Sequence, residues 1–403
     1  MPETPLRALL LEQIHPDATE LLASAGYEIE TVDRALDEGE LVARLPGVHM
    51  IGLRSKTTLT ARAMDAGRDL LAVGAFCIGT NQVDLAAASA HGIAVFNAPF
   101  SNTRSVVELA ISELIALTRR LTEKNEGMHA GVWDKSAAGA HEVRGRTLGI
   151  VGYGNIGTQL SVLAENLGMR VIFHDTADKL ALGNARRAGS LLELLNRSDV
   201  VTLHVDGRAS NKSIFGAPQF AAMKPGSIFM NLSRGFVVDE GALRRHIEAG
   251  RIVGAAVDVF PKEPKGRGDE FVSQLRGLPN VILTPHIGGS TEEAQRDIGR
   301  FVAGKFLDYL TDGNTSLSVN LPPLALPRRK GTLRLIHLHN NVPGVLARIN
   351  GLLAEHGVNV EGQLLGTRGE VGYVVTDSAS GTTQSIVDQI RAMPETIRLR
   401  VIF

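Results

Sequence analysis

Several features that mark whole classes of protein are absent or scarce in this sequence. Cysteine occurs once, as Cys77, which excludes an internal disulfide and a cysteine-rich metal site. No run approaches the roughly 20 apolar residues that a membrane-spanning helix needs, and the N-terminus MPETPLRALL lacks the basic start of a signal peptide. The 42 Lys and Arg nearly balance the 43 Asp and Glu, so the net charge of −1 favours neither nucleic acid nor an anionic membrane. We therefore expect a cytoplasmic protein that binds no metal, nucleic acid or membrane.

The apolar residues that are present form short runs in two successive series. In the first hundred of the 403 residues, runs such as RALLLE and HMIGLR alternate with helix-like stretches, which is typical of βαβ units in a parallel sheet. A second series runs from TLGIVGYG to NVILTPHI, and the helical pattern that follows it is too isolated to form a core alone. We predict two doubly wound parallel-sheet domains, one discontinuous over residues 1–102 and 288–320 and one over residues 103–287.

A proline-rich and basic stretch, LPPLALPRRKG, separates these domains from the C-terminal residues. Its composition predicts a linker over residues 321–331. Beyond it, residues 332–403 show the strand and helix pattern of a small ferredoxin-like βαββαβ unit. This unit contains no cluster of potential catalytic residues.

A glycine-rich turn opens the second series. Gly152, Gly154 and Gly157 form GYGNIG between an apolar strand and a helix, which allows a tight turn, close approach of a pyrophosphate and close packing of helix and strand. Such a turn alone is weak evidence, but Asp175 ends the next strand 18 residues later, where a carboxylate can accept hydrogen bonds from ribose hydroxyls. Asp175 would repel a 2′-phosphate, so the pattern favours NAD over NADP.

Three later strands of this series end in residues suited to hydride transfer. The carboxyl ends of parallel strands meet at one edge of a sheet, so Arg234, Glu263 and His286 are expected to converge there. An imidazole can take the proton of an alcohol, a carboxylate on its other nitrogen raises its pKa, and a guanidinium can hold a substrate carboxylate. Taken singly, such a histidine is more often structural, the arginine of SRG more often lies in a solvated turn, and a glutamate between two prolines is usually on the surface. Their joint presence after a dinucleotide motif favours an active site.

These motifs closely resemble the D-isomer-specific 2-hydroxyacid dehydrogenase family, and in particular its bacterial members that oxidise 3-phospho-D-glycerate and carry a C-terminal ACT regulatory domain. The likeness covers essentially the whole chain and rests on VGYGNIGTQL, NLSRGFVVDEGAL, DVFPKEP, TPHIGGSTEEAQ, FCIGTNQVDL and FNAPFSNTRSVVEL. It implies a flavodoxin-like substrate-binding domain, a Rossmann NAD-binding domain, and catalytic roles for His286 as acid/base, Glu263 as its partner and Arg234 as carboxylate ligand. It also implies cofactor contacts at Gly152, Gly154, Asn155, Ile156, Gly157, Asp175, Leu232, Ser233, Asp258, Gly288 and Gly289.

A further pattern concerns the substrate. The strand HMIGL is followed by Arg54, Ser55, Lys56 and Thr57, two cations and two hydroxyls. Alone, RSKT could be a helix-capping turn; with the resemblance, Arg54, Ser55 and Lys56 are expected to hold the substrate phosphate. Asn102 is a further candidate on the substrate side.

In the C-terminal unit, the loop HNNVPGVL and the stretch GVNV resemble the amino-acid-binding ACT fold. The resemblance implies L-serine as allosteric effector, bound between two such domains by His339, Asn341 and Asn359. The chain departs from the family in having PRRKG where a hinge glycine pair is expected, which leaves the coupling to catalysis open. A homotetramer is also implied, with Trp133 at a contact between cofactor domains.

The expected activity is therefore NAD-dependent oxidation of 3-phospho-D-glycerate to 3-phosphohydroxypyruvate, the first step of serine synthesis, with feedback by L-serine. An oxidoreductase that reduces glyoxylate or hydroxypyruvate, or that also reduces 2-oxoglutarate to 2-hydroxyglutarate, is the alternative in the same class. A noncatalytic NAD-sensing scaffold is the alternative in another class, and the presence of Arg234, Glu263 and His286 disfavours it.

Overall fold

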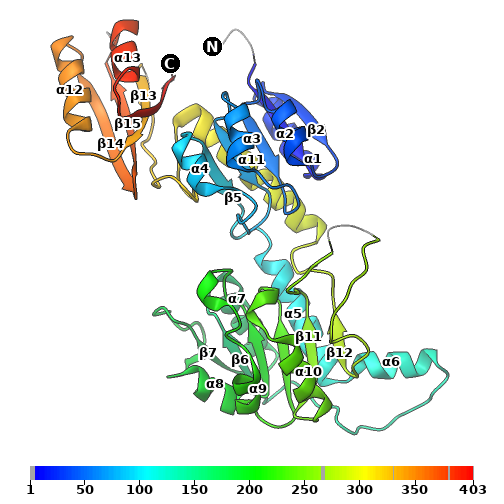
Figure 1. Ribbon diagram of the computed structural model, residues 1–403. Coiled ribbons are helices and arrows are strands. Elements are labelled where there is room, and N and C mark those ends of the chain that lie inside the picture. The colour runs from blue at the N-terminus through cyan, green and yellow to red at the C-terminus, as the bar shows by residue number, and fades with distance from the viewer. Residues whose placement is uncertain (1–4, 265–267, 330, 380–381, 403) are drawn as a thin grey trace. The chain divides into compact units, whose positions relative to one another are not determined.

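A computed structural model describes residues 5–264, 268–329, 331–379 and 382–402 (Figure 1). The chain divides into two compact units: one comprises Met1–Ser101 and Gln295–Phe403, the other Asn102–Ala294. The division into three domains and a linker stays a prediction. Among the described residues, no helix is both long and apolar enough to cross a membrane.

The first unit contains a five-stranded parallel sheet in the order β2-β1-β3-β4-β5, the doubly wound flavodoxin-like order. Strands β3 to β5 are buried along their whole length because helices cover both faces of the sheet. At Gly74 a Cβ would lie 2.6 Å from Val302 of helix α11, so this helix packs back on the sheet. The strands are β1 (Arg7–Leu11), β2 (Glu28–Val32), β3 (Met50–Leu53), β4 (Ala72–Ala75) and β5 (Ala94–Asn97), and the helices are α1 (Pro16–Ser24), α2 (Glu38–Arg44), α3 (Ala61–Ala66), α4 (Leu85–Ala90) and α11 (Glu292–Asp312).

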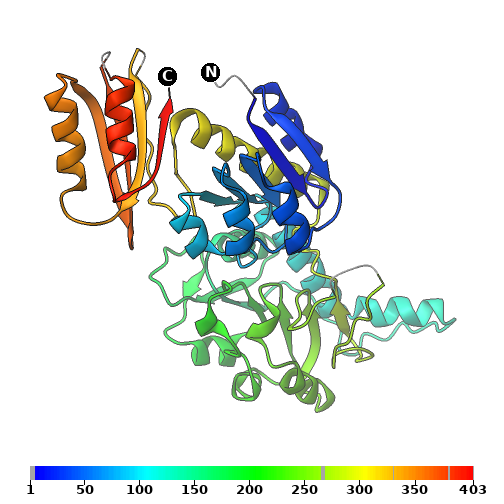
Figure 2. The same cartoon turned by 45° about the horizontal axis from the view of Figure 1, so that its top comes forward.

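The same unit contains a four-stranded antiparallel sheet in the order β14-β15-β13-β16, the ferredoxin-like arrangement that the sequence predicts. Helices α12 and α13 cover one of its faces (Figure 2). Leu335 of the sheet shares a core cluster with Ile349 and Ile386 of these helices. Its elements are β13 (Leu333–Asn340), α12 (Val345–Glu355), β14 (Val360–Arg368), β15 (Val371–Ser378), α13 (Gln384–Arg391) and β16 (Thr396–Ile402).

The other face of this sheet packs on the rest of the first unit. Ile336 and Tyr373 share a core cluster with Phe306 of α11. Three side chains of the sheet also donate hydrogen bonds to carbonyl groups at the C-terminal end of α11: Arg400 to Tyr309 and Leu310, Arg334 to Asp312, and Tyr373 to Gly313. Arg334 is itself fully buried and paired with Asp377.

The stretch with the composition of a linker is packed before it reaches the antiparallel sheet. Leu321 is fully buried and Leu324 nearly so, and both belong to the core cluster of the first unit. The carbonyl of Leu324 accepts a hydrogen bond from the amide of Thr315. The first residues of the predicted linker are therefore packed against the first unit.

The second unit contains a seven-stranded parallel sheet in the order β12-β11-β10-β9-β6-β7-β8, the Rossmann arrangement. The strand order reverses between β6 and β9, so the loops after these two strands face the same crevice. The strands are β6 (Thr147–Val151), β7 (Arg170–His174), β8 (Arg186–Arg187), β9 (Val200–Leu203), β10 (Ser227–Asn231), β11 (Ile252–Val257) and β12 (Val281–Leu283), and the helices are α5 (Thr103–Thr118), α6 (Leu121–His129), α7 (Asn155–Asn166), α8 (Leu191–Arg197), α9 (Ala217–Ala222) and α10 (Glu240–Glu248).

Candidate active site

The glycine-rich turn after β6 has the geometry that a dinucleotide site needs. Gly152 has a φ of +94°, and a Cβ there would lie 2.5 Å from the carbonyl oxygen of His204 in the loop after β9. A Cβ on Gly157 would lie 2.3 Å from the carbonyl oxygen of Gly152. A Cβ on Gly154 would meet nothing within 4 Å, so the turn is open where α7 begins and presents its free N–H groups.

Asp175 lies directly after β7 and faces this turn. One carboxylate oxygen accepts a hydrogen bond from the amide of Tyr153 at 2.8 Å and the other from the amide of Ala177 at 2.8 Å. Each oxygen keeps a lone pair that can accept a ribose hydroxyl. Arg187, which the sequence analysis did not consider, donates to the main-chain carbonyl of Asp175 and pairs with Asp178.

His286 lies three residues after β12, and both its backbone and its side chain are constrained. Its φ of +54° lies in the left-handed region, which is uncommon for a residue other than glycine and occurs often at functional sites. The imidazole is half exposed, and its Nδ1 lies 2.9 Å from one carboxylate oxygen of Glu263 and 3.1 Å from the other. Because Nδ1 is engaged, Nε2 is the nitrogen that can exchange a proton with a substrate.

The two members of this pair shift each other's pKa. The hydrogen bond that His286 donates to Glu263 raises the pKa of His286 despite its partial burial, and the charge of Asp258 adds to the rise. Burial acts to raise the pKa of Glu263, but the hydrogen bond and charge of His286, the amide of Phe260 and the charge of Arg234 together outweigh it, so that pKa is lowered. Glu263 is thus a carboxylate near neutral pH, and it stabilises the imidazolium form of His286.

Arg234 reaches the same edge of the sheet from the end of β10. Its guanidinium donates to the carbonyl of Ser233 at 2.7 Å, and its charge acts on both Glu263 and His286. The glycine that follows it has a packing reason, since a Cβ on Gly235 would lie 1.9 Å from the carbonyl carbon of Phe260. The structure therefore brings Arg234, Glu263 and His286 together within one unit.

Asp258 fixes the loop that carries His286. It is almost fully buried, and its carboxylate accepts hydrogen bonds from the amides of Ile287 at 2.8 Å and Gly288 at 2.9 Å and from the hydroxyl of Thr284 at 2.7 Å. Sequence reasoning assigned it only a cofactor contact and missed this role.

Asn102, also a predicted site residue, lies against the same loop, since a Cβ on Gly289 would be 2.3 Å from its side-chain nitrogen.

The remaining cofactor candidates lie in the same two regions of this unit. Leu232 and Ser233 are buried between β10 and Arg234, and the hydroxyl of Ser233 donates to Asn231. Asn155 and Ile156 form the first turn of α7. Each candidate therefore follows a strand of the parallel sheet at its carboxyl edge, and the contacts with a cofactor stay predictions.

The RSKT stretch lies in the first unit, directly after β3. Arg54 is half-buried, Ser55 and Lys56 are exposed, and Thr57 is fully buried. Helix α3 is capped by Thr60, so the interpretation of RSKT as a helix-capping turn is wrong. Sequence reasoning missed Glu12, whose carboxylate binds the backbone of this stretch; its position directly after the apolar strand LLL was the available signal.

The three predicted effector residues do not meet within one chain. His339 pairs with Gly372, and the amide of Asn341 bonds to Glu370, at the end of the sheet where β13 finishes. Asn359 precedes β14, whose first residue pairs with Ser378 at the opposite end of the sheet. His339 is also nearly buried, so a site made of all three would require two copies of the sheet.

Comparisons with known proteins bear on this geometry. A family model for the D-isomer specific 2-hydroxyacid dehydrogenase NAD binding domain matches residues 111–288, and a model for the AHAS small subunit-like ACT domain matches residues 335–398. D-3-phosphoglycerate dehydrogenase of Haemophilus influenzae is 50% identical over 399 residues, covering 99% of this chain and 97% of that relative. The chain belongs to the D-isomer-specific 2-hydroxyacid dehydrogenases.

A second relative and two solved structures also align with most of this chain. D-3-phosphoglycerate dehydrogenase of Escherichia coli K12 is 50% identical over 401 residues, covering 99% of this chain and 98% of the relative. Among solved structures, a glyoxylate reductase from Paecilomyes thermophila aligns with a TM-score of 0.69 at 27% identity, covering 78% of this chain and 97% of that chain. The TT0316 protein of Thermus thermophilus aligns with a TM-score of 0.69 at 29% identity, covering 76% and 97%. This dehydrogenase is therefore an NAD-dependent enzyme with an ACT domain, as the sequence analysis predicts.

Proposed function

We propose that this dehydrogenase oxidises 3-phospho-D-glycerate to 3-phosphohydroxypyruvate, the first step of serine synthesis. The observation that carries the chemistry is the His286–Glu263 pair at 2.9 Å with the charge of Arg234 beside it. The names of the full-length relatives at 50% identity support the substrate.

Each catalytic side chain has a separate task in this reaction. Arg234 binds the substrate carboxylate through its guanidinium, which orients the alcohol carbon. Bound NAD supplies the acceptor for the hydride that leaves this carbon. Nε2 of His286 accepts the hydroxyl proton as the carbonyl forms, and Glu263 stabilises the resulting imidazolium. In reduction, the same nitrogen returns the proton to the carbonyl oxygen.

The chain supplies what the cofactor requires. The open turn at Gly154 and the N-terminus of α7 would hold the pyrophosphate, and the carboxylate of Asp175 would accept the ribose hydroxyls. The main-chain hydrogen bonds of Asp175 fix its orientation before the ligand arrives.

The substrate phosphate is assigned to Arg54, Ser55 and Lys56. They follow β3, which neighbours β1 at the point where the order of the first sheet reverses, and ligands of doubly wound sheets bind at such points. Two cations there contribute roughly 3 kcal/mol or more to binding a phosphate, which is about a hundredfold in affinity.

The decisive experiment follows NADH oxidation by the purified protein with 3-phosphohydroxypyruvate and with plain hydroxypyruvate. A preference of about a hundredfold in kcat/KM for the phosphorylated substrate is expected. Equal values would instead favour a general 2-hydroxyacid reductase. A parallel assay with 2-oxoglutarate tests the side activity, and an active-site variant, His286→Ala, that still binds NADH without turnover argues against a noncatalytic scaffold.

L-serine is the proposed effector, acting on two copies of the antiparallel sheet. The location of His339 and Asn341 at one end and Asn359 at the other supports a site shared between chains. The proposed homotetramer would supply such pairs. Trp133 is 72% exposed after α6, which suits its proposed place at a contact between cofactor domains. The cytoplasmic location stays a prediction.

A further inference from the structure

The backbone of the RSKT stretch is already bound by a carboxylate from the same unit. Glu12 accepts hydrogen bonds from the amide of Thr57 at 2.8 Å, the amide of Lys56 at 3.0 Å and the amide of Arg54 at 3.2 Å. A single buried side chain thus takes up three of the four amide groups of the stretch. Carboxylate to amide hydrogen bonds of this kind are stronger than neutral ones.

An unusual backbone brings this carboxylate to the loop. Strands β1 and β3 are parallel neighbours, so Glu12 after β1 lies beside Arg54 after β3. Glu12 and Gln13 have φ angles of +63° and +55°, and two successive residues other than glycine in the left-handed region are rarely tolerated without a compensating contact. The hydrogen bonds to the RSKT amides provide that compensation.

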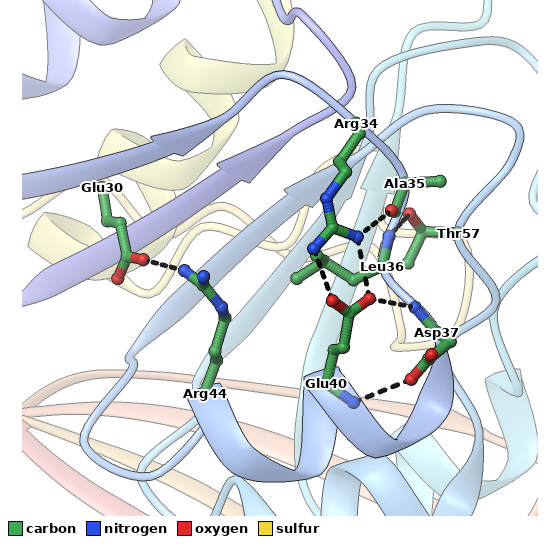
Figure 3. A network of polar contacts seen from close by, with 8 residues as sticks. All are labelled: Glu30, Arg34, Ala35, Leu36, Asp37, Glu40, Arg44 and Thr57. Carbon is green, nitrogen blue, oxygen red and sulfur yellow. Dashed lines mark hydrogen bonds and ion pairs between the residues drawn. The ribbon is translucent and has the colours of Figure 1, made fainter.

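Two further contacts hold the loop from other sides. The side-chain nitrogen of Gln82 donates to the carbonyl of Arg54 at 2.7 Å. The hydroxyl of Thr57 accepts from the amide of Leu36, in a segment fixed by the hydrogen bonds of Glu40 with Arg34 and Asp37 (Figure 3). The main chain of RSKT is therefore held by neighbours, whereas the side chains of Ser55 and Lys56 are exposed.

We propose that Glu12 is a positioning residue for recognition of the substrate phosphate, an inference that rests on the proposed function. With the amides of Arg54, Lys56 and Thr57 engaged by Glu12, the phosphate is bound by the side chains of Arg54 and Lys56 with the hydroxyl or amide of Ser55. Glu12 thus determines where the two cations are presented, although its own charge would repel a phosphate. Glu12 therefore favours phosphate binding by positioning the two cations, and disfavours it through its negative charge.

This opposition makes the role testable with two variants. Glu12→Ala removes both carboxylate acceptors and keeps the main-chain carbonyl that accepts from the guanidinium of Arg54. KM for 3-phosphohydroxypyruvate should therefore rise by about tenfold or more, while kcat/KM for unphosphorylated hydroxypyruvate stays within about twofold. In Glu12→Gln, the amide oxygen can still accept from Arg54 and Thr57, but the NH₂ group faces the amide of Lys56. Its KM should therefore lie between those of the wild type and Glu12→Ala. Exposed Glu20 of α1 provides the matched control, Glu20→Ala, which should leave both substrates unchanged.

The outcomes separate the competing roles. If Glu12 acted only through its charge, Glu12→Gln would bind the phosphorylated substrate more tightly than the wild type, which would overturn the proposal. Equal losses with both substrates would show a purely structural role and would also overturn it. A wild-type enzyme that does not prefer 3-phosphohydroxypyruvate would refute the proposed function itself, independently of any Glu12 variant. Circular dichroism and thermal unfolding check that each variant is folded.

Discussion

The two loops proposed to bind phosphate groups, one in each unit, solve the same problem in opposite ways. Both lie where the strand order of a parallel sheet reverses. In GYGNIG the glycines leave the N-terminus of α7 open, so main-chain N–H groups are available to the ligand. In RSKT the amides of three residues are occupied by Glu12, so side chains must bind the ligand. An open backbone suits a cofactor common to many enzymes, whereas side chains can be changed to select one substrate.

The loop after β12 that contains His286 and Gly288 resembles RSKT, because a carboxylate occupies its main-chain amides. Asp258 occupies the amides of Ile287 and Gly288 as Glu12 occupies those of RSKT. In both loops a buried carboxylate holds the main chain while a neighbouring cationic or titratable side chain remains accessible. Glu263 differs from both carboxylates, because it holds the titratable side chain of His286 in addition to the amide of Phe260.

The largest effect on activity is expected from Glu263, the carboxylate that is hydrogen-bonded to the side chain of His286. Glu263→Gln should lower kcat by on the order of 10²–10³-fold, because the acid/base loses its orientation and its stabilising charge. Oxidation requires neutral His286, so its rate rises as pH increases through the raised pKa of this residue. Removing Glu263 lowers that pKa, and the acid limb of the kcat profile for oxidation should move to lower pH. An unmoved limb would assign the limb to another group.

Binding of the substrate phosphate by side chains can be tested by removing the two cations of RSKT. The double change Arg54→Ala with Lys56→Ala should lower kcat/KM for 3-phosphohydroxypyruvate about a hundredfold and leave the KM for NADH unchanged. Arg62→Ala, an exposed arginine in the same unit, is the matched control. An equal decrease in kcat/KM for hydroxypyruvate would show that these cations do not recognise the phosphate.

Binding of the pyrophosphate by main-chain N–H groups can be tested by substituting Gly154. Gly154→Ala places a methyl group where no atom lies within 4 Å, at a φ of −88° that alanine adopts readily. Thermal stability should be unchanged, while the Kd for NADH rises about tenfold because the methyl group occupies the path of the pyrophosphate. Gly304→Ala in α11, which also meets nothing within 4 Å, should affect neither quantity. Unchanged NADH affinity in Gly154→Ala would contradict this placement of the pyrophosphate.

The last prediction concerns stability rather than activity, at a buried carboxylate without amide partners. Glu113 of α5 is buried, neither oxygen has a hydrogen-bond partner among the described residues, and burial with the charge of Asp258 raises its pKa to about 8. Its contribution to stability is fully present below its unfolded pKa near 4.5 and is lost as pH rises to 8. Glu113→Gln should therefore gain stability relative to the wild type between these pH values, on the order of 1 kcal/mol per pH unit.

Thermal unfolding at pH 5, 7 and 9 measures this difference. The advantage of Glu113→Gln should grow from pH 5 to pH 7 and change little beyond about pH 8, the raised pKa of this residue. Glu12→Gln should show the reverse sign at every pH, because it loses an acceptor for a main-chain amide. A constant difference across pH would show that Glu113 does not titrate in this range.

Residues at strand ends were predictable because parallel strands finish at one edge. Arg234, Glu263 and His286 each follow an apolar run, so their convergence needed only the fold class. Glu12 and Asp258 were missed or given another role because their partners are main-chain amides of loops that become neighbours only after the sheet assembles. The separation of Asn359 from His339 depends on antiparallel pairing, which no local pattern revealed.

The way the antiparallel sheet ends α11 has a consequence for modularity. Arg334, Arg400 and Tyr373 supply donors to the last carbonyls of a helix that begins six residues after His286, and Ile336 completes the core around Phe306. A chain ended before Leu333 would expose this apolar surface and leave those carbonyls to water. The sheet is thus a structural part of the first unit as well as a candidate sensor, and grafting it onto another enzyme would require transfer of the end of α11 with it.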